Sequence, residues 1–406
     1  MLTNIPCISS QELLDSLAGD LYCGYRNLFS ESPLRVLSVE NGQSKSAIIF
    51  SRYDQVKYFL DQSQLTSKEV EESSFFYSGG AFSESLLFKN NPEHHQLKKL
   101  FSQYFRRVPV SRYGELAESM SRECFEEAVL QGQVDDFEIM GGFCKKLPLA
   151  VVMQLLGFPK DVREKISVLS QSVANGADHV TSSAVAEDNK NKAFSRLLEF
   201  LEDDILERRE FPPQSLIANV QYLVKAKQIS KRCAVSNIAL LLFAGQETTA
   251  ALFGSMVYCL ASFPQQLFHL RQNRVLVDSA IEEVLRFESP LQRATFRSVK
   301  TDLSIDGLGF AKGEEVVLMI GAANRDERIF DRASEFIISR TPNQHLSFGK
   351  GAYHCLGRQL AVIEARAVCH FLLDRFPRRW NVSKAQWEKS TLLRSLKTLH
   401  INFNAC

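Results

Sequence analysis

The chain has 406 residues, 45% of them hydrophobic and 23% charged, which is the composition of a folded globular protein. Its formal net charge of +1 argues against a nucleic-acid or membrane-surface binder, because such proteins carry a marked basic excess. Nine cysteines stand without metal-ligand spacing, and their odd number argues against a disulfide framework. The first ten residues lack the basic flank and apolar core of a signal peptide. We therefore expect a cytoplasmic protein.

Helical patterns dominate the first two thirds of the chain. One runs from about Ser10 to Phe29, and a hairpin follows, with a turn at 41–42 and a strand at 47–50. Residues 73–88 show no period and are expected to form a loop. From 92 to 263 nearly everything is predicted to be helix. The breaks fall at Phe158-Pro159, Asn175-Gly176 and Phe211-Pro212-Pro213.

The last third changes to short strands separated by turn signals. This pattern begins after Arg286 and includes a strand at 315–320. A final helix is predicted from about Arg358 to Arg375, because Pro377 cannot continue it, and residues 399–403 are expected to form a strand. There is no repeat or linker. The sequence predicts a mainly α protein with minor β-structure, in a single domain over residues 1–406.

One segment, from Asn237 to Phe263, is apolar and long enough to cross a bilayer. Its centre holds Gln246, Glu247, Thr248 and Thr249, and an acidic group at mid-bilayer costs roughly 2.5–3.5 kcal/mol. A central helix of a large core explains the pattern better. A membrane-anchored helical protein is the alternative, and we expect no membrane association.

A glycine-rich loop at residues 348–357, with the sequence FGKGAYHCLG, holds Cys355 directly before the last predicted helix. A thiol at a helix N-terminus meets the positive end of the helix dipole and unpaired N–H groups, which favour a thiolate that can ligate iron. Taken alone, such a cysteine is more often a buried free thiol. The spacing Phe-x-x-Gly-x-basic-x-Cys-x-Gly resembles the haem-binding loop of the cytochrome P450 superfamily. That superfamily usually has Arg or His where this chain has Tyr353.

The resemblance implies the cytochrome P450 fold, with haem between a long distal helix and the proximal cysteine loop. It also implies haem b (iron protoporphyrin IX) as cofactor, with Cys355 as the axial iron ligand. The other residues that it places at the haem are His94, Lys98, Ala244, Gly245, Thr249, Arg297, His345, Phe348, Gly349, Tyr353 and Gly357.

The run Ala244-Gly-Gln-Glu-Thr-Thr249 resembles the Ala-Gly-x-(Asp/Glu)-Thr element of the family's distal helix. There the helix loosens at the glycine to admit dioxygen. The resemblance makes Thr248 and Glu247 the catalytic pair, with Thr248 hydrogen-bonding activated dioxygen and Glu247 relaying protons from water. The alternative is a threonine bonded back to its own helix and a glutamate paired with a lysine.

Glu283 and Arg286 stand at i, i+3 on one predicted helix face. They resemble the family's Glu-x-x-Arg pair, which is buried and braces the haem loop. The third member of that network is usually an Arg before a Phe, and the matching place here holds Glu335. Arg325 and Arg340 are the two alternatives.

Haem carries two propionates, and their burial requires paired cations. The resemblance assigns this role to His94, Lys98, Arg297 and His345, although each of them alone is more often a surface charge. Lys98 stands where the family more often has Arg, whose planar fork an ammonium lacks.

Substrate residues are less defined. Strand alternation puts Arg293, Thr295 and Arg297 on one face, so Arg293 is a candidate partner for an anionic substrate, unless it turns outward at a bulge. Phe76 and Phe82 are candidates for the roof of an apolar substrate site.

The predicted function is therefore a monooxygenase that uses dioxygen to oxidise, by hydroxylation, a small organic substrate. Similar bacterial-type members receive electrons from a ferredoxin or flavodoxin. The basic residues expected to meet such an acidic donor are Lys98, Lys99, Arg106, Arg107, Lys350 and Arg358. Two alternatives are a peroxide-driven enzyme, although those tend to lack an acid–alcohol pair, and a haem-binding sensor or carrier without turnover.

Overall fold

The computed structural model describes residues 5–9, 12–13, 21–30, 32–40, 43–62, 65–68, 84–107, 110–130, 136–174, 184–294, 297–305 and 308–405. They fall into two compact units, each assembled from separate stretches of the chain. The first unit holds Met1–Tyr77, Glu282–Cys355 and Thr391–Arg394, and the second holds Ser78–Ile281, Leu356–Ser390 and Ser395–Cys406. The predicted class, mainly α with minor β, is confirmed. A single domain over the whole chain remains a prediction.

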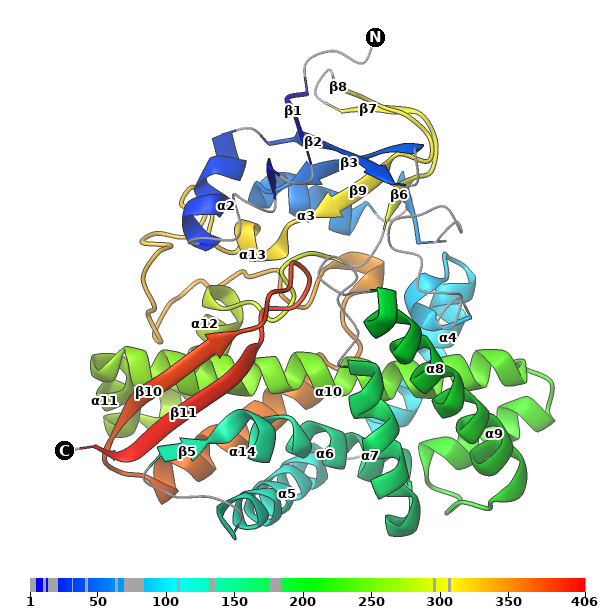
Figure 1. The fold of residues 1–406 in the computed structure, drawn as a ribbon, viewed down its shortest axis with the longest axis vertical. Helices are drawn as coiled ribbons and strands as arrows, with labels where there is room; N and C mark the ends of the chain where they lie inside the picture. Colours follow the sequence, from blue (N-terminus) through cyan, green and yellow to red (C-terminus); the bar gives the residue numbers. More distant parts are fainter. Residues whose placement is uncertain are drawn as a thin grey trace. The chain divides into compact units, whose positions relative to one another are not determined.

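The first unit is built around a sheet whose strand order, within the described residues, is β1-β2-β3-β9-β6-β4 (Figure 1). The strands are β1 (Cys7–Ser9), β2 (Leu34–Glu40), β3 (Gln43–Phe50), β4 (Thr66–Ser67), β6 (Ser298–Val299) and β9 (Glu315–Leu318). Strands β2 and β3 form the predicted hairpin, with Glu40 opposite Gln43; the turn residues 41–42 lie outside the described part. Strand β9 pairs in parallel with β3, so the late strands return to the early hairpin.

Short helices complete this unit. They are α2 (Leu21–Ser30), α3 (Tyr53–Asp61), α13 (Ile320–Ala323) and the end of α12 (Val277–Phe287). A second small sheet pairs β7 (Leu303–Ile305) with β8 (Leu308–Phe310). The apolar core joins residues of β3 and β9 to α3, including Phe50, Phe59 and Leu318, each no more than 3% exposed. Val299 of β6 belongs to the same core, so the core also holds β6 in place.

The second unit is helical. Its helices are α4 (Glu93–Arg107), α5 (Val110–Leu130), α6 (Lys146–Leu156), α7 (Lys160–Ala174), α8 (Ala184–Phe200), α9 (Leu216–Lys225), α10 (Lys231–Ser262), α11 (Pro264–Gln272) and α14 (Arg358–Arg375). The predicted breaks at 158–159, 175–176 and 211–213 all fall between these elements, and α14 has its predicted bounds.

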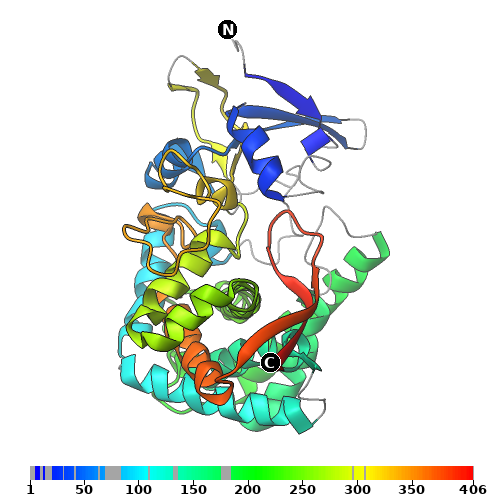
Figure 2. The ribbon, with the colours of Figure 1, turned by 90° about the vertical axis from the view of Figure 1, so that its left-hand side faces the viewer.

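The described part of the predicted helical region also contains three features that the sequence pattern did not indicate. Residues Phe137–Glu138 form strand β5, Met140–Cys144 form a short π-helix before α6, and a π-helical stretch at Leu201–Arg208 continues α8. Strand β5 is the edge of a sheet with β10 (Arg379–Trp387) and β11 (Leu396–Ala405), and β10 was also not predicted. Figure 2 looks nearly along α10, with α14 and the β10–β11 ribbon on either side of it.

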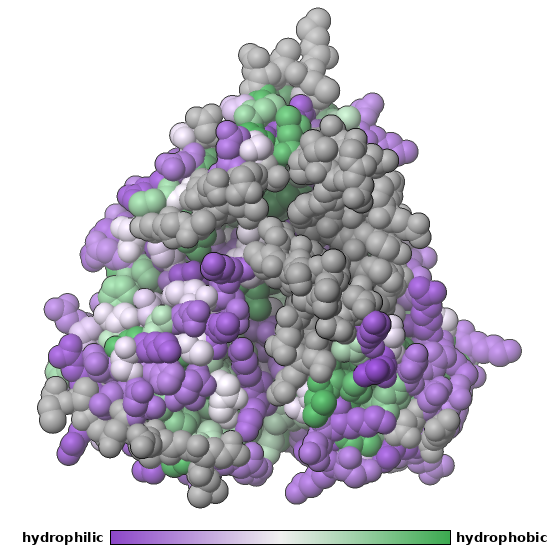
Figure 3. Space-filling model, in the orientation of Figure 1, coloured by the Kyte–Doolittle hydropathy of each residue, from purple (hydrophilic) through white to green (hydrophobic). Residues whose placement is uncertain are grey.

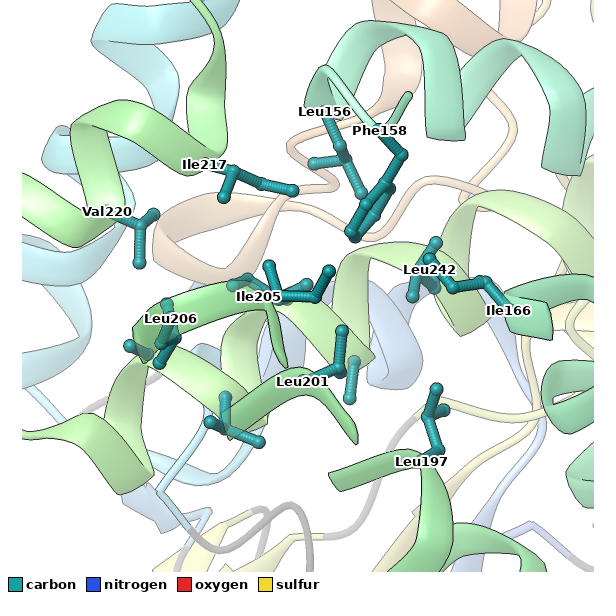
Figure 4. Close-up of a cluster of buried hydrophobic side chains, with 14 of the residues drawn as sticks. Leu156, Phe158, Ile166, Leu197, Leu201, Ile205, Leu206, Ile217, Val220 and Leu242 are labelled. Atoms are coloured by element: carbon teal, nitrogen blue, oxygen red, sulfur yellow. The ribbon is translucent and has the colours of Figure 1, made fainter. Parts of the chain in front are cut away.

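Helix α10 is the central element of the second unit. Ser230 caps its start, because the Ser230 hydroxyl accepts a hydrogen bond from the Cys233 N–H at 3.0 Å. By length and composition it is the one helix of the described chain able to cross a membrane, and 61% of its apolar window is buried. Leu242 of α10 lies in the apolar cluster of Figure 4, with Leu156, Ile166 and Leu201 from α6, α7 and the π-helical stretch. This burial favours the core-helix interpretation over the membrane-anchored one.

Among the coloured residues of Figure 3, hydrophilic side chains are spread over the face shown, and apolar ones form only small groups.

Candidate functional site

The cysteine loop of the first unit places one thiol in an open position. Cys355 is exposed, and its backbone N–H donates to the Phe348 carbonyl at 2.8 Å, which closes the loop. Gly349 and Gly351 both have φ of +67°, a left-handed conformation that glycine adopts without strain. A Cβ at Gly351 would stand 2.7 Å from the Leu60 carbonyl oxygen, so the loop backbone lies directly against the end of α3.

The remaining cysteines differ from Cys355 in their surroundings. Of the eight that the structure describes, none is in a disulfide and only Cys7, Cys23 and Cys355 are exposed. Burial raises the pKa of Cys124 to about 11 and that of Cys369 to about 12, so neither forms a thiolate readily. Cys355 alone combines exposure with a glycine loop at the start of a long helix.

Two buried cations lie over the ring of Tyr353 in the same unit. The Arg297 guanidinium carbon lies 5.2 Å from the ring centroid, and the Lys68 ammonium lies 5.2 Å from it as well. Arg297 is 2% exposed; its Nη1 donates to the Thr66 hydroxyl at 3.4 Å, while its buried Nε has no hydrogen-bond partner in the described structure. Burial lowers the pKa of Arg297 to about 10. A buried guanidinium that still has a hydrogen-bond donor available is suited to bind an anionic group.

His345, a predicted propionate donor, has protein partners at both ring nitrogens. Its Nε2 lies 2.6 Å from a Glu282 carboxylate oxygen, and its Nδ1 accepts from the Ser347 N–H at 3.2 Å. The ring packs against Phe348, with centroids 6.0 Å apart. These contacts hold the start of the cysteine loop in place, and the role of His345 at a propionate stays a prediction.

Glu283 and Arg286 form a bidentate ion pair with both side chains fully buried, at 2.8 and 2.9 Å. The third member is Arg340, whose Nε lies 3.0 Å from a Glu283 carboxylate oxygen. Arg286 also donates to the Ala333 and Glu335 carbonyls, so the pair braces the segment before the loop. The other alternative, Arg325, stacks instead on the Phe287 ring at 3.5 Å.

The second unit holds the acid–alcohol pair inside α10. Desolvation raises the pKa of Glu247; the Lys145 charge opposes this shift and the Glu388 charge adds to it. The Thr248 hydroxyl donates to the Ala244 carbonyl at 2.7 Å, which is the back-bonded state that the sequence offers as an alternative. Thr249 is buried.

Helix α10 is α-helical through Gly245, so the loosening expected from the resemblance is not seen. A Cβ at Gly245 would stand 2.6 Å from a Val152 methyl group, which shows that α6 packs directly on the α10 backbone at this glycine.

The other predicted residues are placed separately. His94 is buried on α4, with the half-buried Lys98 one turn further along. Arg293 is half-buried in the segment between α12 and β6. Phe76, Phe82 and Thr295 lie outside the described residues. The sequence did not single out Lys68, since nothing in its local pattern separates it from a surface lysine.

Comparison with known proteins identifies this arrangement. The family model for cytochrome P450 matches residues 183–397. The biotin biosynthesis cytochrome P450 of Bacillus subtilis (strain 168) is 33% identical over 320 residues, covering 78% of this chain and 80% of that protein. This chain belongs to the cytochrome P450 family.

Other cytochromes P450 agree over nearly the whole length. The nocardicin C N-oxygenase of Nocardia uniformis subsp. tsuyamanensis is 30% identical, covering 94% of this chain and 95% of that protein. The crystal structure of P450BioI in complex with hexadec-9Z-enoic acid-ligated acyl carrier protein is 30% identical, with a TM-score of 0.82 over 97% of this chain and 100% of that one. The predicted fold and haem-dependent monooxygenase activity are confirmed.

Cytochromes P450 bind haem, and the residues of this chain fit it. The open Cys355 thiol is suited to ligate the iron, and the unused donor of Arg297 is suited to a propionate. Bound haem supplies the redox chemistry of dioxygen, and the chain supplies binding, orientation and protons.

Proposed function

We propose that this cytochrome P450 hydroxylates a small organic substrate with dioxygen and takes two electrons from a separate ferredoxin or flavodoxin. The observation that carries the proposal is the acid–alcohol pair of α10. Because desolvation raises the pKa of Glu247, this carboxyl keeps its proton to a higher pH than an ordinary glutamate does. Cleavage of dioxygen consumes protons, and a carboxyl group that stays protonated in a desolvated position is suited to donate them.

Thr248 fits the second half of this task. While its hydroxyl donates to the Ala244 carbonyl, its oxygen still has lone pairs that accept a hydrogen bond. Rotation of the side chain redirects the donor away from the helix backbone. The hydroxyl is thus suited to pass a proton from Glu247 to a reacting oxygen.

The test compares Thr248→Ala with Thr248→Ser, which keeps the hydroxyl. With a ferredoxin system and a substrate found by its spectral shift, Thr248→Ala should consume NADH at a similar rate. We expect it to release at least fivefold more hydrogen peroxide per product molecule, while Thr248→Ser stays within about twofold of wild type. Equal coupling in all three proteins would contradict the proton-relay role. Turnover with peroxide and none with the ferredoxin system would indicate the peroxide-driven alternative. No turnover under either condition would indicate a haem-binding sensor or carrier.

We also propose that the substrate carries a carboxylate or another anion that pairs with Arg293. Arg293 is half-buried and its Nε is shielded from solvent, which supports an inward position over the outward bulge. In spectral titrations of carboxylate ligands, Arg293→Ala should raise Kd at least tenfold, and Arg293→Lys should raise it less. The methyl esters of the same ligands should bind both variants like wild type. Unchanged affinity of Arg293→Ala for the carboxylates would contradict this proposal.

A cytoplasmic location is part of the same proposal. It is supported by the eight described cysteines, none of which is in a disulfide. Acidic electron donors fit the exposed basic side chains Lys99 and Arg358, at α4 and at the start of α14.

A further inference from the structure

The central helix α10 is open to one side in its middle. Residues 233–239 and 249–257 are all buried, whereas Ala244 between them is exposed. Leu241 and Thr248 are half-buried, and the three residues stand at i, i+3 and i+7 on one helix face. This face of the helix is therefore available to a bound molecule, and it is closed at both ends.

Asn237 lies on the same face, one turn before Leu241, where the buried stretch begins. Its Oδ1 accepts a hydrogen bond from the Leu86 N–H at 2.9 Å. Its Nδ2 donates to the Cys233 carbonyl at 2.8 Å and to the Glu84 carbonyl at 3.4 Å. Asn237 is 1% exposed, and both ends of its carboxamide are used. A buried amide bonded to two backbone groups of another segment attaches that segment to the helix.

The attached segment, residues 84–89, is held together by its own contacts. The Phe88 N–H donates to the Ser85 carbonyl at 3.1 Å, and Lys89 pairs with Glu84 at 3.0 Å. The Ser85 hydroxyl is buried and has no hydrogen-bond partner in the described structure, so it does not attach the segment to α10. The segment is one piece, and its place on the helix depends on the asparagine.

We propose that Asn237 is a positioning residue that limits how far a substrate extends along α10. By holding residues 84–89 across the helix, Asn237 places an end wall on the open face. Thr248 marks the reacting end of this face, and Asn237 lies about 16 Å before it along the helix axis. The inference rests on the proposed function in taking Thr248 as the reacting end.

The part of the substrate that reaches this wall is apolar. Leu86 of the attached segment and Leu241 of α10 both pack against the apolar cluster that contains Leu242. Ala244, the exposed residue of the face, adds no polar side chain. A hydrocarbon chain or ring fits such a surface, and a charged group there would lose its hydration without a partner.

The test uses 1-alkylimidazoles, from ethyl to dodecyl, as rulers. Their free ring nitrogen ligates haem iron and shifts the Soret band to the red, so spectral titration of ferric holoenzyme gives a Kd for each chain length. Each methylene that is buried should lower Kd about fourfold. In wild type we expect this gain to stop at a definite chain length, where the chain meets residues 84–89.

Two variants remove the attachment. Asn237→Leu keeps nearly the same side-chain volume without the three hydrogen bonds, and Asn237→Ala also leaves space. In both, the gain in affinity should continue for at least two further methylenes, so the longest chain should bind at least tenfold more tightly than to wild type. Ser255→Ala is the matched control, because it changes another buried polar side chain of α10, and it should keep the wild-type limit.

Imidazole itself should bind all four proteins within about twofold, which separates a changed length limit from a general loss of structure. A wild-type series without a limit, or the same limit in both Asn237 variants, would overturn the inference. If Asn237→Ala is purified without haem, the isosteric Asn237→Leu decides. Imidazole ligation uses neither Glu247 nor Thr248, so failure of the proton relay would leave the measured limit unchanged. A wild-type protein whose spectrum does not respond to imidazole would contradict haem binding, and with it the inference.

Discussion

At the residue scale, the Glu283 network is the feature on which the cysteine loop depends most. Glu283 accepts from Arg286, from Arg340 and from the Ile337 N–H at 2.8 Å, and it is fully buried. Removal of one partner from such a network leaves uncompensated buried charge. The chain segment before the cysteine loop is therefore held by buried ion pairs, and loss of any one partner should destabilise it.

We predict that Glu283→Gln lowers the free energy of unfolding by about 3–5 kcal/mol, because two buried guanidinium groups lose their counter-charge. Urea unfolding followed by circular dichroism measures this change. Asp278→Asn is the control, since it removes the exposed ion pair with Arg366 and should cost about 1 kcal/mol or less. Equal effects of the two substitutions would show that the buried network does not stabilise the fold.

Glu364 is a buried carboxyl on α14 whose Oε2 has no hydrogen-bond partner in the described structure. Burial raises its pKa well above the ordinary value, so the folded protein binds a proton that the unfolded chain has released above about pH 4.5. The free energy of unfolding that Glu364 contributes is therefore most favourable at low pH, and it decreases as the pH rises toward the pKa of Glu364 in the folded protein.

Glu364→Gln removes this titration. We predict that the stability of the variant relative to wild type increases by up to about 1.4 kcal/mol per pH unit between pH 4.5 and the raised pKa of Glu364 in the folded protein. Urea unfolding at several pH values measures the slope. Glu118→Gln, on an exposed position of α5, should show a flat difference, and a flat difference for Glu364→Gln would contradict the assignment.

The residue scale is also where sequence reasoning stopped short. It placed Glu283 and Arg286 but could not choose between Arg325 and Arg340, because the choice depends on which loop folds back onto α12. It missed Lys68, since lysine is almost never fully buried and a local pattern cannot show that this side chain lies over the ring of the distant Tyr353. Long-range pairing, not residue chemistry, was the missing information.

At the element scale, two glycines of α10 differ in what an added methyl group would contact. A Cβ at Gly245 would meet a Val152 methyl at 2.6 Å, and one at Gly254 would meet the Met140 sulfur at 2.5 Å. Valine is stiff at χ1, whereas methionine has several rotatable bonds and can move away. Alanine also favours the helix over glycine by about 1 kcal/mol.

We predict that Gly245→Ala destabilises the protein by about 1–3 kcal/mol through overpacking, while Gly254→Ala is neutral or stabilising. Thermal unfolding compares them. Val152→Ala added to Gly245→Ala removes the clash and should recover part of the loss. A destabilised Gly254→Ala beside an unaffected Gly245→Ala would show that α6 does not pack on α10 as described.

Elements with strong local signals were predictable. Helix α14 has the bounds that Gly357 and Pro377 imply, and the breaks at proline and glycine separate the other helices. Strand β10 escaped prediction because its residues do not alternate: most of Arg379–Trp387 is exposed, and the strand is defined by its pairing with β11. Strand β5 has two residues and exists only through the same sheet.

At the scale of the whole molecule, a net charge of +1 means that attraction to the acidic electron donor that we propose must come from local clusters of basic residues. We predict that reduction by an acidic ferredoxin slows as ionic strength rises, because screening weakens the encounter. Lys99→Glu and Arg358→Glu should each slow reduction at low salt, and Lys397→Glu, on the exposed side of β11, should not. Stopped-flow kinetics measure these rates, and insensitivity to salt would argue against a charged docking surface.

The whole account depends on Cys355 holding haem iron. The most direct measurement is the absorption spectrum of the dithionite-reduced protein under carbon monoxide, recorded for wild type and Cys355→Ser. We predict a strongly red-shifted Soret band in wild type that is lost in the variant. Absence of haem, or a band typical of histidine ligation in both proteins, would contradict the account.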